Sequence, residues 1–271
     1  MHRPNWRSRF VKALVVVSST LILAGCFDVE QKIVLKKNLS GTAEFKMGID
    51  FEPMVLIMTA MQREMEGKTG EPTKAELDAA RQKFLDEMKN EPLPDMKSEI
   101  AKANKEMPAG IKMLDATAKQ EGLKMLSGFV FSFDDIGKLN QVAMPKDKKE
   151  GEEAGGPPGP GTGTGIDKPF EGLVVKDEGA TILITSKPLN PTEDVKEQAP
   201  PSEDGKMDKQ MENAFKSMRV AYRIESELEV VEHNAKRKDG KALVWEWKWE
   251  DFKKMEKSGA TDMGVRVRFK K

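Results

Sequence analysis

The sequence predicts an α+β fold: an antiparallel sheet of hairpins with a helical insertion and two disordered polar loops. Three observations predict it. Apolar and polar residues alternate with period two near both ends of the chain, methionines recur at helical spacing between them, and two segments are rich in charge, glycine and proline. Period two is typical of half-buried strands, and a spacing of three to four residues is typical of one helix face. The polar segments, about 146–168 and 188–206, hold too few apolar residues to join a core.

The first strands form a hairpin in this prediction. Apolar and polar residues alternate over 27–35 and again over 43–50. The segment 37–41 (KNLSG) lies between them and supplies the Asn and Gly that tight turns favour.

A helical insertion is expected over about 51–110. Pro53 suits a first helical turn, and Thr73 with Glu76 forms a capping-box pattern that starts a second helix. A third short helix is expected over 95–106, because 108–110 (PAG) favours its end. The first helix carries a methionine stripe at helical spacing: Met54, Met58, Met61 and Met65.

The remainder alternates strands with short connecting elements. Strands are expected at 123–133, 219–230, 243–249 and 265–269, a hairpin at 170–186, short helices at 135–142 and 206–217, a turn at 234–240 and a helical turn at 251–257. Because long surface insertions cost little closure entropy, the polar loops need not separate domains, and 26–271 is expected to be a single α+β domain.

Residues 1–25 differ from the rest and have the pattern of a secretory signal. A basic opening without acidic residues precedes Ala13–Leu23, an apolar run of 11 residues. A helix that spans a bilayer needs about 20 residues, so this run is too short to cross as a helix.

The run ends at Leu23, Ala24, Gly25 and Cys26, and Cys26 is the only cysteine in the chain. This tetrapeptide resembles the lipobox of bacterial lipoproteins. The resemblance implies cleavage before Cys26 and a covalent N-acyl diacylglyceryl lipid on it, with palmitate among the acyl chains; no other cofactor is expected. Several acyl chains anchor a protein firmly where one holds it marginally. The alternatives are an ordinary signal peptide with a chance cysteine, or an uncleaved anchor.

Composition excludes several classes. The 271 residues include 45 Lys+Arg, 45 Asp+Glu and two histidines, and 33% of them are charged. Without the four basic residues of the leader, the mature chain has 41 basic and 45 acidic residues, a net charge of −4. Nothing in this balance indicates a nucleic-acid partner. One cysteine excludes an internal disulfide framework and a multi-cysteine zinc site.

Several short segments together match a known family. They are the post-cysteine hairpin with its Ser40-Gly41 turn, 128–136 (GFVFSFDDI), 218–235 (MRVAYRIESELEVVEHNA), Asp239-Gly240, Val244-Trp245 and 265–269 (VRVRF). In these segments the chain resembles the LppM-like domain of bacterial lipoproteins. The resemblance leaves out 51–110 and both polar loops, and implies a small α+β envelope domain with no established catalysis.

Two apolar patterns are candidate ligand-binding surfaces. Trp245, Trp247 and Trp249 have the period of one sheet face. They form either an aromatic platform for lipid, glycan or the membrane interface, or part of the core. The methionine stripe, with Met54, Met58 and Met61 as its candidates, forms either an adaptable groove for acyl chains or partner helices, or a buried helix face.

No catalytic or metal-binding motif is present, and the chain is not expected to be an enzyme. The expected function is that of a lipid-anchored envelope lipoprotein that binds a lipid, an amphipathic ligand or an envelope partner. The alternatives are a structural lipoprotein that scaffolds an envelope complex and, less favoured, an envelope-polymer hydrolase. The expected location is the periplasmic face of the outer membrane in a two-membrane organism, because Phe27 rather than aspartate follows the cysteine.

Overall fold

The computed structural model describes residues 26–90, 93–143, 168–187, 212, 215–258 and 264–271. The expected leader, nearly all of both polar loops and most of the expected helix at 206–217 lie outside these ranges. The α+β class is confirmed, because two sheets and several helices share one hydrophobic core.

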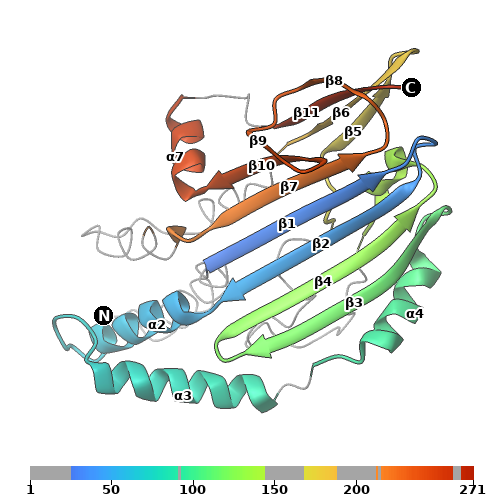
Figure 1. Ribbon diagram of the computed structural model, residues 1–271. Coiled ribbons are helices and arrows are strands. Elements are labelled where there is room, and N and C mark those ends of the chain that lie inside the picture. The colour runs from blue at the N-terminus through green and yellow to red at the C-terminus, as the bar shows by residue number, and fades with distance from the viewer. Residues whose placement is uncertain (1–25, 91–92, 144–167, 188–211, 213–214, 259–263) are drawn as a thin grey trace, which may run out of the picture.

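A seven-stranded sheet dominates the structure (Figure 1). Its strand order is β3-β4-β2-β1-β7-β10-β9, and β1 is parallel to β7 while the other described pairs are antiparallel. The strands are β1 (Cys26–Leu35), β2 (Gly41–Asp50), β3 (Ile111–Glu121), β4 (Lys124–Phe133), β7 (Arg219–Ser226), β9 (Arg237–Asp239) and β10 (Ala242–Lys248).

A smaller sheet has the order β5-β6-β11-β8. It consists of β5 (Leu173–Asp177), β6 (Thr181–Ser186), β8 (Val230–His233) and β11 (Val265–Lys270). The 3₁₀ helix η1 (Ile136–Gln141) follows β4, and α7 (Trp249–Ser258) follows β10. The predicted hairpin at 170–186 and the predicted last strand are therefore present in this second sheet.

Three helices lie between β2 and β3, as the helical insertion predicts. They are α2 (Glu52–Met65), α3 (Lys74–Asn90) and α4 (Met96–Glu106). Pro53 lies in the first turn of α2. The Asp95 carboxylate accepts a hydrogen bond from the Lys97 amide at the start of α4. Helix α4 packs on β3. The Asn104 side chain of α4 exchanges two hydrogen bonds with the backbone of Met113, at the edge of the large sheet. This pairing covers part of an edge strand that would otherwise present free backbone groups.

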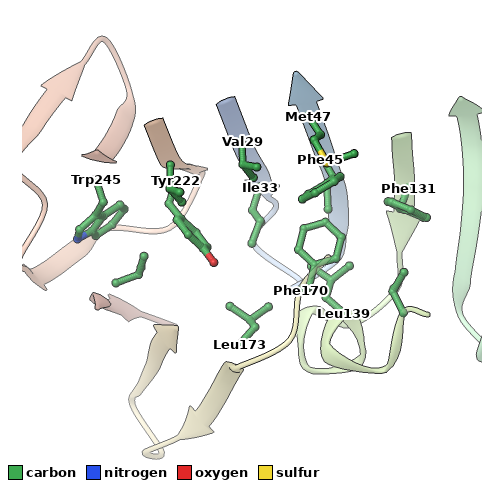
Figure 2. Packing of buried hydrophobic residues seen from close by; sticks show 14 of the residues in the cluster. Val29, Ile33, Phe45, Met47, Phe131, Leu139, Phe170, Leu173, Tyr222 and Trp245 are labelled. Carbon is green, nitrogen blue, oxygen red and sulfur yellow. The ribbon is translucent and has the colours of Figure 1, made fainter. Parts of the chain in front are cut away.

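The core lies against one face of the large sheet (Figure 2). Side chains from β1, β2, β4, β7 and β10 meet Leu139 of η1, Phe170 and Leu173. The ring of Phe131 on β4 contacts that of Phe170 edge to face, with centroids 5.9 Å apart. This contact joins the segment 168–187 to β4 of the large sheet.

Four details differ from the sequence prediction. The hairpins form two sheets rather than one, and the expected strand at 219–230 is interrupted after Ser226, so that β8 pairs with β11 in the smaller sheet. Within the expected turn at 234–240, residues 237–239 form the edge strand β9. Strand β3, over 111–121, is an element that the sequence patterns did not indicate, because its buried and exposed residues do not alternate regularly.

Candidate functional site

Cys26 is the first residue of β1, at one end of the large sheet. It pairs with Asp50, the last residue of β2, and Asp50 in turn pairs with Lys124 at the start of β4. The described chain therefore enters regular structure at the cysteine, without an intervening tether. The other candidate lipobox residues, Leu23, Ala24 and Gly25, lie outside the described residues.

Helix α2 starts at this same end of the sheet. One Asp50 carboxylate oxygen accepts a hydrogen bond from the Glu52 amide at 3.0 Å, and the other lies 3.5 Å from the Lys124 ammonium. Asp50 thus connects the end of β2 both to the first turn of α2 and to β4. Phe51, the residue between β2 and α2, is buried against Phe84 of α3, with ring centroids 5.4 Å apart.

The methionine stripe of α2 runs from the core to the surface. Met54 is 5% exposed and belongs to the core, and Met61 is half-buried. Met58 and Met65 are 48% and 56% exposed. The two halves of the stripe therefore differ: its beginning packs against the protein, whereas its end presents thioether side chains to the surroundings.

Ion pairs fix α3 against the other side of α2. Arg63 of α2 binds the carboxylate of Glu76, and Arg81 of α3 binds Glu52 through its Nε at 2.7 Å and through a second nitrogen. Glu76 also accepts bonds from the amide and hydroxyl of Thr73, both at 2.8 Å. These Thr73 bonds, together with Arg63, lower the pKa of Glu76 to about 2.

The three tryptophans do not share one environment. Trp245 and Trp247 on β10 are 1% and 2% exposed, and both pack in the core. Trp249 is the first residue of α7 and stacks on Phe215, with centroids 4.9 Å apart. The period-two pattern therefore continues past the end of the strand, and no exposed platform is built from Trp245 and Trp247.

Residues of possible chemical interest elsewhere have structural partners. The Nδ1 atom of His233 accepts a hydrogen bond from the Ala235 amide at 3.1 Å. Lys236 donates to the Glu246 carbonyl and lies 5.6 Å from the centre of the Trp247 ring. Within the described ranges, no cluster of three His, Cys, Asp or Glu side chains could hold a metal ion.

The open face of the large sheet carries an ion-pair network that the sequence patterns did not indicate. The Arg219 guanidinium contacts Asp28 at 2.8 Å, Glu246 at 3.2 Å and Glu30 at 3.4 Å. Partial burial opposes its charge, but hydrogen bonds and charge attraction from Asp28 and Glu246 prevail, and the pKa of Arg219 is raised. The partners are 27 to 191 residues apart in the chain, so only the strand order brings them together.

No helix in the described part of the chain is both long and apolar enough to cross a bilayer.

Comparison with known proteins assigns no family. No family model matches the chain, and no curated protein matches it. Among solved structures, the chain is similar to the folded domain of the Mycobacterium tuberculosis protein LppM, determined by NMR, with a TM-score of 0.42 and 9% identity over 90% of this chain and 89% of that chain. At that score and identity, the likeness assigns neither an activity nor a ligand.

Proposed function

We propose that this protein is a lipid-anchored lipoprotein of the bacterial cell envelope that acts by binding rather than by catalysis. Its ligand would be a lipid or another amphipathic molecule, or a second envelope component. The observation that carries the proposal is the sequence Leu23-Ala24-Gly25-Cys26 behind a basic and apolar leader. The acylated Cys26 would be the first mature residue, and the chain enters β1 at that residue.

The direct support for binding comes from apolar surface. Met58 and Met65 expose flexible, polarizable thioethers, and such side chains adapt to irregular apolar partners.

The residue after the cysteine is Phe27 rather than aspartate, which favours the outer membrane over the inner membrane where two membranes exist. The mature net charge of −4 offers no general attraction to nucleic acid.

The anchoring step is tested by substituting the cysteine. In cells fed labelled palmitate, Cys26→Ser should abolish incorporation of the label and release the protein from the membrane fraction, because serine lacks the thiol that accepts the diacylglyceryl group. Thr20→Ser, a conservative change in the same leader, is the matched control and should retain both label and membrane location. A Cys26→Ser protein that still carries label and remains in membranes would refute the proposal.

The binding role needs a second measurement. Native mass spectrometry of the detergent-extracted lipoprotein should reveal a co-purifying lipid or protein beyond the covalent anchor. The acylated protein without any bound partner, extracted under several mild detergents, would argue against a binding function and leave anchoring intact.

A further inference from the structure

The end of the sheet that holds Cys26 also directs α2 away from the sheet. Cys26 pairs with Asp50, so their Cα atoms lie about 5 Å apart, and α2 begins two residues later at Glu52. Figure 1 shows α2 continuing beyond the end of the sheet at which β1 begins. At about 1.5 Å of rise per residue, Met58 and Met65 lie about 9 and 20 Å along the helix from Glu52.

The two sides of α2 have different surroundings. Glu52 and Arg63 both bind α3, and they lie on one side of α2 because eleven residues make about three turns. At about 100° per residue, Met58 and Met65 lie roughly 120–160° around the helix from these two residues. The exposed methionines therefore face away from α3. Leu56, which is 38% exposed, lies within about 40° of Glu52 and Arg63, on the α3 side.

We infer that the methionine face of α2, formed by the exposed Met58 and Met65 with the half-buried Met61 between them, rests on the lipid surface into which the Cys26 anchor inserts. This inference rests on the proposed lipidation of Cys26. The contact would make α2 an interfacial helix beside the anchor, and would fix the orientation of the domain relative to the bilayer.

Because no tether separates Cys26 from β1, the membrane is the partner that the methionine face of α2 would contact. An acylated residue lies at the bilayer surface, and Cys26 is already part of β1, so the sheet end is held at that surface. Because α2 projects past the same sheet end, the domain cannot approach the bilayer through Cys26 without bringing α2 to it. Apolar side chains that are brought to a lipid interface are stabilised by insertion among the head groups.

The test uses the full lipoprotein, purified and reconstituted into phosphatidylcholine vesicles. Single cysteines at Met58 and Met65 are labelled with an environment-sensitive dye, and quenching by spin-labelled lipid is measured. Cys26 is the only native cysteine and carries a thioether once acylated, so the introduced thiol is the only reactive one. Leu56→Cys is the matched control on the opposite side of α2. Val231→Cys on β8, at a position that is 55% exposed, is a distant control in the smaller sheet. Unchanged tryptophan fluorescence verifies that each variant is folded.

We expect dye at positions 58 and 65 to shift its emission to the blue and to be quenched by spin-labelled lipid, whereas dye at positions 56 and 231 stays in water. Emission typical of water at 58 and 65, or equal quenching at 56 and 58, would overturn the inference while anchoring stands. Protection of 58 and 65 in native envelopes but not in vesicles would point to a protein partner and would also overturn it. Reaction of the dye with the unsubstituted lipoprotein would show a free Cys26 thiol and refute the anchoring proposal as well.

Discussion

Individual polar residues stabilise the contact between the two sheets. Gln31 of β1 is buried, and its Nε2 donates to the Pro169 carbonyl at 2.6 Å. Tyr222, the neighbour of Gln31 on β7, is also buried and donates its hydroxyl to the Lys187 carbonyl at 3.4 Å. Buried polar groups are stable only when they are hydrogen-bonded, so these bonds restrict how the segment around 168–187 can pack on the large sheet.

The burial of Tyr222 predicts a loss of stability at high pH. Burial raises the pKa of Tyr222 to about 12 in the folded protein, although hydrogen bonds with Ser186 and Gln31 lower it in part. The pKa of an unperturbed tyrosine, as in the unfolded chain, is 10.0. Between these values the unfolded chain releases the phenolic proton and the folded chain keeps it, so the free energy of unfolding falls as pH rises. Two pKa units correspond to about 3 kcal/mol.

This effect is measurable because Tyr222 is the only tyrosine in the chain. The ultraviolet absorbance of tyrosinate should report its titration near pH 12 in the folded protein. Between pH 10 and 12, the urea midpoint of Tyr222→Phe should fall less steeply than that of the unsubstituted protein. Titration of the folded protein near pH 10 would contradict the assigned burial.

Asn234 supports a second buried donor. Its Oδ1 accepts the Trp245 indole N–H at 2.7 Å and the Arg266 amide at 2.8 Å, and its Nδ2 donates to the Gly264 carbonyl at 2.9 Å. Asn234→Ala should reduce the free energy of unfolding by about 1–3 kcal/mol, because it leaves a buried indole N–H without a partner. The urea midpoint with an unchanged slope measures this loss. Asn140→Ala, on the exposed end of η1, should leave the midpoint nearly unchanged, and equal losses in both variants would contradict the explanation.

At the scale of elements, the capping box decides where α3 starts. The Glu76 amide donates to the Thr73 hydroxyl at 3.3 Å, and the Glu76 carboxylate accepts from Thr73 in return. Thr73→Ala should cost about 1 kcal/mol of stability, as is typical of a lost N-cap. Thr69→Ala, an exposed position four residues upstream, is the matched control in urea denaturation.

The same substitution should change the titration of Glu76. Its pKa of about 2 depends first on the bonds from Thr73 and then on Arg63, so removal of the hydroxyl should raise the pKa toward 4.5. Because the folded value is lowered, the contribution of Glu76 to stability is present above pH 4.5 and is lost as pH falls toward 2. An NMR titration of the Glu76 carboxyl checks this direction, and an unchanged pKa in Thr73→Ala would show that the hydroxyl bond is not formed.

Elements with local signals could be predicted from the sequence. The turn at 37–41, the Thr73–Glu76 box and the alternation in 265–269 each specify an element through neighbouring residues, and each element is present. Long-range arrangement had no local signal. The parallel pairing of β1 with β7 and the transfer of β8 to the smaller sheet depend on residues far apart in the chain.

The candidate surfaces were less predictable for a similar reason. Periodicity places residues on one face but does not say what covers that face along its length. Met54 and Met65 share a helix face yet differ from 5% to 56% exposed, because only the start of α2 packs on the core. Trp249 continues the pattern of Trp245 and Trp247 although the strand has ended at Lys248.

At the scale of the whole molecule, residues before 144 and after 167 build one core. Strand β1 lies between β2 and β7 at the centre of the large sheet, and β1 pairs with β7 from Asp28 to Leu35. Further contacts cross between the same two parts of the chain: Gln31 binds Pro169, and Phe131 packs on Phe170. Neither part can keep these apolar surfaces buried without the other.

Cutting the chain between residues 144 and 167 should therefore leave the two fragments associated. A recognition sequence for a site-specific protease is inserted there, and the uncut protein with the same insertion is the matched control. The cut pair should elute from a size-exclusion column at the uncut position and keep its near-ultraviolet circular dichroism, because the β1–β7 ladder and the core against β5 and η1 do not depend on that peptide link. The cut pair should unfold at a lower denaturant midpoint than the uncut protein. This midpoint should rise with protein concentration, because association of the two fragments is bimolecular. Separate elution of the two fragments in native buffer would contradict the conclusion that the two parts of the chain depend on each other.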